Sequence, residues 1–177
     1  MFRRSCHPRL LLASSLSQLL PDFVSGVLRG RLYRWAGFDV SPGAFLMGRV
    51  QLTSAFPGFY TKLSIGPGTV VAGPVTMNLD APVTIGRNVA IGPHVLIYTG
   101  SHRIGPGSMR IGPNVALPVV IEDGAWVRLG AVITPGVTIG RGSIVAAGAV
   151  VLKDVAANSY VEGNPAQAVH RLPWGNR

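Results

Sequence analysis

Histidine is the residue type in this chain that is best suited to acid–base catalysis. Its imidazole has an unperturbed pKa near 6.5, so a neutral basic nitrogen is available at pH 7. Among the four histidines, His102 stands apart because it closes the segment Tyr98-Thr-Gly-Ser-His102, at the start of an interruption in a regular repeat. Long loops on compact scaffolds are usually functional, and a neutral insertion is the alternative. His102 is therefore the first candidate for a general base.

The repeat around this interruption has a period of six residues. It is strictest from residue 121 onward, where aliphatic residues and glycines return at the same spacing. The aliphatic residues are Ile121, Val127, Ile133, Ile139, Val145 and Val151, and the glycines are Gly124, Gly130, Gly136, Gly142 and Gly148. This period fits neither an amphipathic helix nor a simple strand alternation. It predicts an all-β hexapeptide solenoid, in which short strands form a parallel β-helix with one aliphatic side chain per strand pointing inward.

The earlier part of the solenoid follows the pattern less regularly. We expect it to begin near Val40, with glycine and proline at its corners, as in Ile91-Gly-Pro-His94. Between Ile97 and Ile121 the pattern fails. The simplest explanation is one external loop that leaves a single coil and returns to it.

The beginning of the chain predicts helix instead. Residues 10–36 are expected to be helical, with Pro21 at a helix start and Gly37 at the end. An apolar stripe contains Phe23, Val24, Val27, Leu28 and Leu32, and the charge comes from Arg29, Arg31 and Arg34. Gly26 and Gly30 each weaken a helix by about 1 kcal/mol relative to alanine, so the segment needs a docking surface. Two interpretations stay open: a cap over the end of the solenoid, or a basic amphipathic helix on an anionic membrane.

The composition is that of one domain with excess positive charge. The 177 residues include 16 Lys and Arg against 7 Asp and Glu, a net charge of +9. Such a balance suits polyanionic partners: nucleic acid, an anionic membrane or phosphate-bearing small molecules. The single cysteine, Cys6, allows no intramolecular disulfide, and no apolar run is long enough to span a bilayer. Residues 1–20 resemble a signal peptide, but polar residues break the apolar stretch, so we expect no cleavage.

Four segments, in order along the chain, carry a resemblance to a known family. They are Asn78-Leu-Asp-Ala-Pro-Val-Thr-Ile-Gly86, Ile97-Tyr-Thr-Gly-Ser-His102, Pro118-Val-Val-Ile-Glu-Asp-Gly-Ala-Trp126 and Gly163-Asn-Pro-Ala166. In this order and spacing they resemble the hexapeptide acyltransferases, in particular the galactoside, maltose, nodulation-factor and exopolysaccharide O-acetyltransferases. The resemblance covers about residues 60–171. It implies a left-handed β-helix, although parallel crossovers are nearly always right-handed, and a homotrimer with its active sites in clefts between subunits.

The resemblance also implies roles at the acceptor. Acetyl transfer from a thioester to a hydroxyl needs a base, and a positioned base contributes roughly 10²- to 10⁴-fold. His102 matches the catalytic histidine of the family. Asp80 matches a residue that hydrogen-bonds the acceptor, Asn78 is a weaker match, and Trp126 lies where the family has an aromatic wall. A turn carboxylate is the structural alternative for Asp80, and plain packing is the alternative for Trp126.

The implied donor is acetyl-CoA, and its contacts fall in the last coils. Leu129 matches the position whose backbone N–H contacts the thioester, which makes it a candidate oxyanion donor. Gly130, Gly148 and the small Ala147 leave a smooth wall for pantetheine. Lys153 matches a lysine near the CoA phosphates.

At two donor positions the chain departs from the family. Gln167 and His170 stand where the sugar acetyltransferases carry basic residues that hold the 3′-phosphate. Charge-assisted hydrogen bonds are about twice as strong as neutral ones, so either CoA binds weakly or Arg171 replaces the missing contacts. Arg128 stands where relatives usually carry glycine.

Other functions compete with this interpretation. The γ-type carbonic anhydrases share the scaffold but need three zinc-binding histidines, two of them closely spaced, and the four histidines here lack that spacing. A non-catalytic solenoid that binds a membrane or a glycan is the second alternative. Nucleic-acid binding is disfavoured because no aromatic stacking platform is interleaved with the basic residues.

The sequence therefore predicts three segments: a helical cap or membrane-surface segment over 1–38, a left-handed β-helix acyltransferase domain over 39–171, and a tail over 172–177. It predicts an acetyl-CoA-dependent O-acetyltransferase without a metal that acts on a sugar or surface-glycan hydroxyl. The basic helix prompts the hypothesis of a lipid-linked acceptor. We expect a cytoplasmic protein, attached peripherally to the inner face of the plasma membrane if the helix binds lipid.

Overall fold

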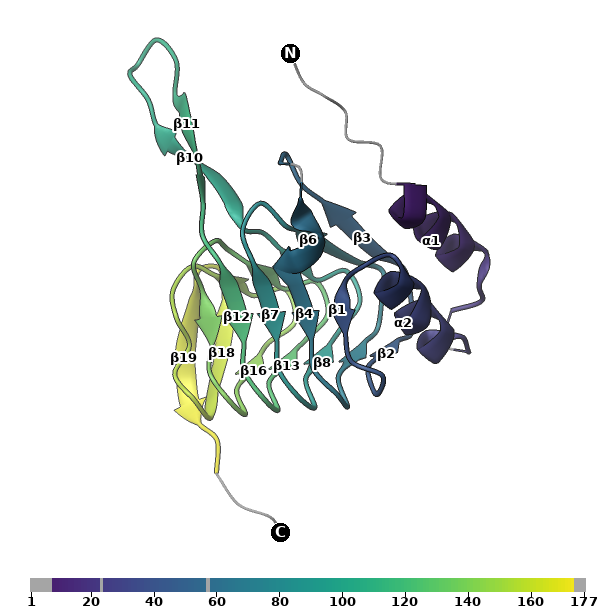
Figure 1. Cartoon of the computed structure of the whole chain (residues 1–177). Helices are drawn as coiled ribbons and strands as arrows, with labels where there is room; N and C mark the ends of the chain where they lie inside the picture. The colour runs from purple at the N-terminus through teal and green to yellow at the C-terminus, as the bar shows by residue number, and fades with distance from the viewer. Residues whose placement is uncertain (1–7, 23, 57, 174–177) are drawn as a thin grey trace.

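The computed structural model of the chain describes residues 8–22, 24–56 and 58–173. The charged residues 1–7, Phe23 of the predicted stripe, and residues 174–177 of the predicted tail lie outside these ranges. Most of the described chain is a stack of coils, each made of three short strands, and two helices lie at the N-terminal end of the stack (Figure 1). The predicted solenoid is confirmed.

The strands of successive coils form three parallel sheets. Sheet A contains β1 (Asp39–Val40), β4 (Leu63–Ile65), β7 (Val83–Ile85), β12 (Val119–Ile121) and β15 (Thr138–Ile139). Sheet B contains β2 (Phe45–Leu46), β5 (Val70–Val71), β8 (Ala90–Ile91), β13 (Trp126–Val127), β16 (Ile144–Val145) and β18 (Ser159–Gly163), with β19 (Ala166–Arg171) antiparallel at its end. Sheet C contains β3 (Val50–Thr53), β6 (Val75–Asn78), β9 (Leu96–Ile97), β14 (Val132–Ile133) and β17 (Val150–Val151).

The six-residue period puts one aliphatic side chain of each strand at the same place in every coil. In sheet A, Ile65 pairs with Ile85, Ile85 with Ile121, and Ile121 with Ile139. Each of these residues is at most 2% exposed. Equivalent columns run down the inner faces of sheets B and C, so the core is a continuous apolar column along the solenoid axis.

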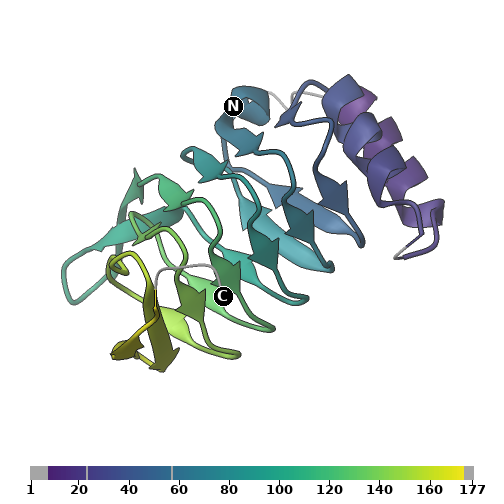
Figure 2. The ribbon, with the colours of Figure 1, turned by 90° about the horizontal axis from the view of Figure 1, so that it is seen from below.

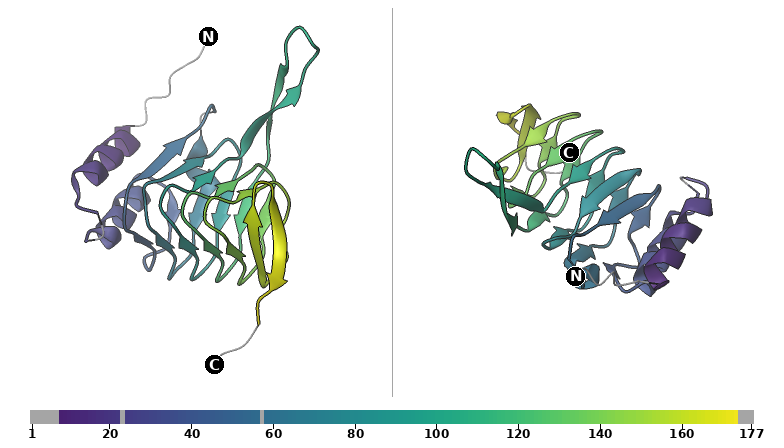
Figure 3. Two further views of the ribbon diagram at one scale, coloured as in Figure 1. Left: turned by 180° about the vertical axis from the view of Figure 1, so that it is seen from behind. Right: turned by 90° about the horizontal axis from the view of Figure 1, so that it is seen from above.

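The interruption of the repeat is a β-hairpin rather than an irregular loop. It consists of β10 (Gly100–Ile104) and β11 (Ile111–Ala116), which pair antiparallel. The hairpin leaves the solenoid between β9 of sheet C and β12 of sheet A, and it projects away from the coils (Figures 1 and 3). The corner between sheets C and A is therefore the one that carries His102.

The predicted helical segment is divided into two helices, α1 (Pro8–Leu19) and α2 (Gly26–Trp35). The prediction of a helix start at Pro21 was wrong, because Pro21 lies in the connection between the helices and α2 begins five residues later, after Ser25. Gly37 does follow the end of α2, with a φ of 109° that favours glycine. Helix α2 packs on β1 and β2, and α1 packs on α2 (Figure 2).

The face of α2 that packs on the solenoid is not the predicted apolar stripe. The buried residues of α2 are Gly26, Arg29, Gly30 and Tyr33. Gly26 lies against the ring of Phe45, where an added Cβ would come within 2.6 Å of a ring carbon. The glycines that weaken the isolated helix therefore allow its close approach to β2, and the Val24, Val27 and Leu28 side chains face outward.

Arg29 joins the two helices to the first coil. Its side chain is fully buried, and its guanidinium donates to the carbonyl oxygens of Ser17 at 3.3 Å and Met47 at 3.0 Å. It also donates to the carbonyl oxygen of Leu20 and to Asp22 Oδ1, the latter at 3.0 Å. Five N–H donors in a fixed plane allow one arginine to satisfy several carbonyls at once. Arg29 therefore replaces the apolar contact that the sequence suggested.

Tyr33 adds a second polar contact on the same face. Its hydroxyl donates to the Val50 carbonyl oxygen at 2.7 Å, and burial raises the pKa of the Tyr33 phenol. The phenol therefore stays protonated, and remains a donor, at neutral pH.

Replacing Arg29 by methionine should loosen the helices from the solenoid. The substitution leaves several buried carbonyls without a donor, and we expect the free energy of unfolding to fall by about 3 kcal/mol. Urea denaturation followed by circular dichroism measures the change. Arg31→Met, on the exposed side of the same helix, is the matched control and should stay within about 0.5 kcal/mol of the wild type. Equal effects of the two substitutions would contradict the role of Arg29.

Candidate active site

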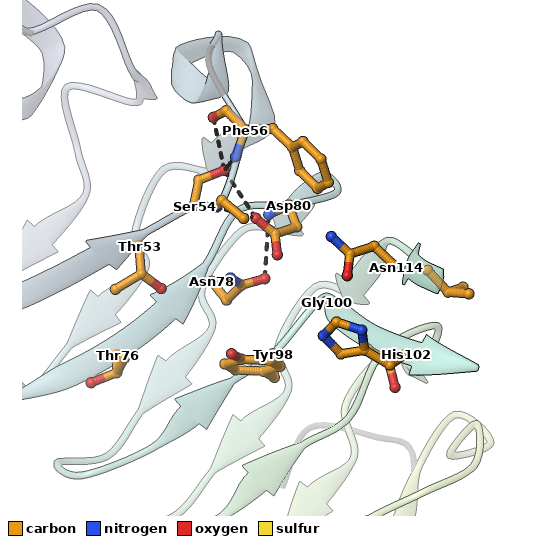
Figure 4. A pocket seen from close by; sticks show the side chains of 13 residues that line it. Thr53, Ser54, Phe56, Thr76, Asn78, Asp80, Tyr98, Gly100, His102 and Asn114 are labelled. Atoms are coloured by element: carbon orange, nitrogen blue, oxygen red, sulfur yellow. Dashed lines mark hydrogen bonds between the residues drawn. The ribbon is translucent and has the colours of Figure 1, made fainter. Parts of the chain in front are cut away.

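A hollow of about 450 Å³, with both polar and apolar lining residues, lies between the hairpin and the outer surface of sheet C. It brings together Asn78, Asp80 and His102, three residues that the sequence predicted for the acceptor side. Figure 4 shows Asp80 and His102 on different walls of this hollow, with Asn114 and Tyr98 beside His102. The volume lies in the range of small-molecule binding sites.

The His102 ring is oriented by the hairpin that carries it. Its Nδ1 lies 2.9 Å from the carbonyl oxygen of Gly112, on the opposite strand. A carbonyl oxygen only accepts hydrogen bonds, so Nδ1 must carry the proton in this contact. The neutral ring then keeps the lone pair of Nε2 free. The hairpin thus fixes the tautomer that a general base needs.

Asp80 is held by one of its two carboxylate oxygens. Oδ1 accepts hydrogen bonds from the backbone N–H of Ala55 at 2.6 Å and from the hydroxyl of Ser54 at 3.0 Å. Oδ2 lies beside Gly100, where an added Cβ would come within 2.5 Å of it. The lack of a side chain at Gly100 therefore lets the start of the hairpin lie against the carboxylate. This anchoring leaves Oδ2 as the acceptor on the side of the hollow.

Asn78 is buried, and its side-chain oxygen is already used. Oδ1 lies 2.8 Å from the hydroxyl of Thr99 and 3.3 Å from the backbone N–H of Asp80. Because a backbone N–H can only donate, the oxygen of the amide faces it. The Asn78 amide nitrogen remains as a donor toward the hollow that Asn78 lines.

Sequence reasoning missed several residues that line the hollow. Asn114 lies directly opposite His102 in the hairpin, and this register could not be read from a segment without a repeat. Ser54 and Phe56 come from the connection after β3, which carries no motif. Tyr98 was quoted only as part of the His102 segment, although its position directly after β9 is a usable signal.

Two residues predicted for the donor side lie at a different corner of the solenoid. Leu129 and Ala147 are exposed where sheet B turns into sheet C, and Gly148 N–H donates to the Leu129 carbonyl oxygen at 2.8 Å. Within the described residues, the backbone N–H groups of Leu129 and Ala147 donate no hydrogen bond to a backbone carbonyl in the turns and loops. A Cβ at Gly130 or Gly148 would meet no atom within 4 Å. This corner therefore presents free N–H donors on an open surface.

The comparisons with known proteins agree with this arrangement. The family of bacterial transferase hexapeptide proteins (six repeats) matches residues 118–153. Nodulation protein L of Rhizobium meliloti is 38% identical over 129 residues, which are 73% of this chain and 68% of that protein. The chain belongs to the hexapeptide-repeat acetyltransferase family. A galactoside O-acetyltransferase of Lactococcus lactis is 30% identical over 121 residues, 66% of this chain and 58% of that protein. The chain spans about half the length of the curated relatives that it matches first.

Solved structures of hexapeptide-repeat acetyltransferases have the same fold. One from Vibrio cholerae, complexed with acetyl coenzyme A, has a TM-score of 0.70 and 31% identity, and the match covers 98% of this chain and 93% of that one. A galactoside acetyltransferase in complex with coenzyme A has a TM-score of 0.66 at 23% identity, over 97% and 86% of the two chains, which shows the fold alone. The solenoid is a left-handed parallel β-helix, as the resemblance implied.

The remaining residues predicted for the hexapeptide-repeat acetyltransferase site lie outside the hollow. Trp126 is on the outer face of sheet B, where its ring stacks with the Arg128 guanidinium at 5.2 Å. The Trp126 side chain therefore does not form a wall of the hollow within one protomer. Arg128, which stands in place of a family glycine, has its partner on the same face.

The predicted phosphate contacts divide into two groups. Lys153 and Gln167 line a second hollow, of about 270 Å³, at the C-terminal end of the solenoid. The His170 ring stacks on Tyr160, with centroids 5.0 Å apart, and Arg171 pairs with Ser159 in the last hairpin. Lys153 is the cationic side chain among the described residues that line that hollow.

The described residues were also compared with the requirements of a metal site and of a membrane-spanning helix. Among residues 8–22, 24–56 and 58–173, no group of three or more His, Cys, Asp and Glu side chains is placed to hold a metal ion. No helix in these ranges is long and apolar enough to cross a membrane.

The hydrogen bond to Gly112 makes a prediction for the His102 ring. Long-range ¹H–¹⁵N correlation spectra of the protein at neutral pH should show a protonated Nδ1 and an unprotonated Nε2 for His102. His94, which lies outside the hollow, serves as a reference for an exposed ring. A spectrum with the proton on Nε2 of His102 would show that the Gly112 contact does not orient the ring.

Proposed function

We propose that the protein is an acetyl-CoA-dependent O-acetyltransferase whose acceptor is a hydroxyl of a sugar or surface glycan. The observation that carries this proposal is the orientation of His102, whose free Nε2 belongs to the same polar hollow as Asp80. The relatives are consistent with it, because they include galactoside O-acetyltransferases and a structure complexed with acetyl coenzyme A.

The chemistry follows from the groups present. A hydroxyl of the acceptor next to the reacting one donates a hydrogen bond to Asp80 Oδ2 or accepts one from the Asn78 amide, and the reacting hydroxyl donates to His102 Nε2. Nε2 takes the proton as the oxygen attacks the thioester carbonyl. The C–O bond forms, the C–S bond breaks, and the imidazolium returns the proton to the leaving thiolate. The Leu129 N–H is the proposed donor to the oxygen that becomes negative.

This mechanism requires more than one protomer. Within one chain, His102 lies at the corner between sheets C and A, and Leu129 and Ala147 lie at the corner between sheets B and C. We infer that a homotrimer brings the donor corner of one subunit to the hairpin of the next. Trp126 then belongs to a wall between subunits.

The outer faces of the sheets support such an assembly. The outward side chains of sheet A are mostly polar, and those of sheets B and C are mostly apolar or aromatic. In sheet A they are Asp39, Ser64, Thr84, Val120 and Thr138; in sheet B Phe45, which α2 covers, and Val70, Ala90, Trp126, Ile144 and Tyr160; in sheet C Gln51, Thr76, Leu96, Val132 and Val150. Two apolar faces per protomer are what a closed ring of subunits needs.

The acceptor and the location are further parts of the proposal. A lipid-linked sugar acceptor agrees with the basic N-terminal segment, in which residues 1–34 contain six arginines and one acidic residue. The protein would then work in the cytoplasm, attached peripherally to the inner face of the plasma membrane. No nucleic acid is part of this function.

Titration with acetyl-CoA by calorimetry tests the donor. We expect saturable binding with about one site per protomer, weaker at higher salt because the donor carries phosphates. Lys153→Gln should weaken binding by roughly fivefold, since it removes one charge-assisted contact. Arg87→Gln, an exposed arginine at another corner, should change little. Absence of saturable binding would favour a non-catalytic β-helix instead.

Acetyl transfer to a panel of free glycosides tests the base. His102→Ala should lower the rate of CoA release by roughly 10²- to 10⁴-fold while acetyl-CoA binding is kept. His94→Asn is the matched control, because Asn tolerates the positive φ of 60° at that position. A His102→Ala protein with full activity would remove His102 from the mechanism.

A further inference from the structure

The two N-terminal helices have their polar and apolar sides reversed relative to a soluble cap. Their buried residues are small, polar or charged: Ala13 and Ser17 in α1, and Gly26, Arg29, Gly30 and Tyr33 in α2. In a soluble helical cap the large aliphatic residues would face the core. Here that position is taken by the buried Arg29 and its hydrogen bonds.

Leu10 and Leu32 pack against the core, and the other large apolar residues of the helices and of their connection point to solvent. They are between 44% and 82% exposed. We call them the outer apolar face, and they are Leu11, Leu12, Leu16, Leu19, Val24, Val27, Leu28 and Trp35. Within α1 the spacing of Leu12, Leu16 and Leu19 places these side chains on one side of the helix. Eight exposed large apolar residues gathered on two packed helices and their connection mark an interaction surface rather than a single surface leucine.

The charges around the outer apolar face have one sign. Arg9 and Arg31 are exposed on the two helices. The sequence from residue 1 to residue 38 contains a single acidic residue, Asp22, and Arg29 pairs with it. An apolar face with a cationic border suits the boundary between acyl chains and anionic headgroups. It does not suit a second copy of the same face, because pairing two such faces would bring arginines together with no carboxylate between them.

We propose that the outer apolar face of α1 and α2 binds an anionic membrane surface, with the leucines in the acyl boundary and Arg9 and Arg31 at the headgroups. The solenoid itself stays outside the bilayer because α2 holds it through its other side. This deepens the peripheral attachment given under the proposed function by naming the surface that makes it, and it does not depend on the acetyl-transfer chemistry.

The inner side of the same helices lies close to the candidate active site. The inner side of the helices forms one wall of a polar hollow of about 450 Å³, lined by Ser17 and Tyr33 from the helices and by Arg49 and Thr76 from the solenoid. Thr76 also lines the hollow that contains His102. The two hollows therefore meet at Thr76 on the outer surface of sheet C.

Co-sedimentation of the full chain with vesicles tests the surface. We expect binding to vesicles of phosphatidylcholine mixed with phosphatidylglycerol at low salt, and much weaker binding to phosphatidylcholine alone. The triple variant Leu12→Gln, Leu16→Gln and Leu19→Gln should lose at least about tenfold in vesicle affinity, because it removes the apolar contact. Met109→Gln, an exposed apolar residue at the hairpin, is the matched control and should bind like the wild type.

The charge contribution is tested separately. Arg9→Glu with Arg31→Glu should weaken binding to the anionic vesicles about tenfold at low salt, and the difference should shrink as salt is added. Arg87→Glu makes the same type of change on the solenoid and should have a smaller effect. Circular dichroism and the acetyl-CoA titration on every variant show whether the fold and the donor site are kept, so a failure of the membrane surface is distinguishable from a failure of the enzyme.

Three results would overturn the proposal. The first is a wild-type chain that stays in the supernatant with anionic vesicles at low salt. The second is a leucine variant that binds the vesicles as tightly as the wild type. That result would mean that the net positive charge of the protein, and not the outer apolar face, causes the binding. The third is a leucine variant whose assembly has a smaller mass by light scattering, which would make the outer apolar face a contact between copies of the chain.

Discussion

The stacking of one aliphatic side chain on the next, coil after coil, is the constraint on which the rest of the structure depends. Val127 lies between Ile91 and Val145 in sheet B, and Ile133 lies between Ile97 and Val151 in sheet C. Each inward residue is covered by its neighbours above and below, so the coils cannot shift by one residue without exposing the whole column. The result is a rigid solenoid that holds the residues at its corners in fixed positions relative to one another.

The corners differ in what they carry, and this difference organises the site. Between sheets C and A the chain leaves the solenoid as a hairpin, which holds the His102 ring through the Gly112 carbonyl. Between sheets B and C the tight glycine turns leave the Leu129 and Ala147 backbones exposed. In the proposed mechanism the base on one corner and the N–H donors on another meet through a neighbouring subunit. The apolar outer faces of sheets B and C offer the contact surface for it.

The N-terminal helices cover the first coil of the solenoid mainly through polar contacts and close backbone packing. The end of a solenoid exposes the edges of its first coil, and a cap must cover them. Here α2 covers that end with glycine close to Phe45 and with a buried arginine that bonds backbone carbonyls. The large apolar residues are thereby left for the outer side. The polar inner side of the cap and its apolar outer side are thus two sides of one arrangement, in which Arg29 and Tyr33 of α2 face the solenoid and bond its carbonyls.

The sequence by itself determined the solenoid, because a six-residue period with inward aliphatic residues is compatible with no other packing of short strands. It also determined the family and placed Asn78, Asp80 and His102 at one site, because the order and spacing of the matching segments are those of the family. It did not determine which face of α2 is buried, because Arg29 becomes a core residue only when the carbonyls of Ser17, Leu20 and Met47 converge on it. Nor did it determine the register that sets Asn114 opposite His102, or the corner at which Leu129 is exposed. Those depend on contacts between residues far apart in the chain, and only the tertiary structure decides them.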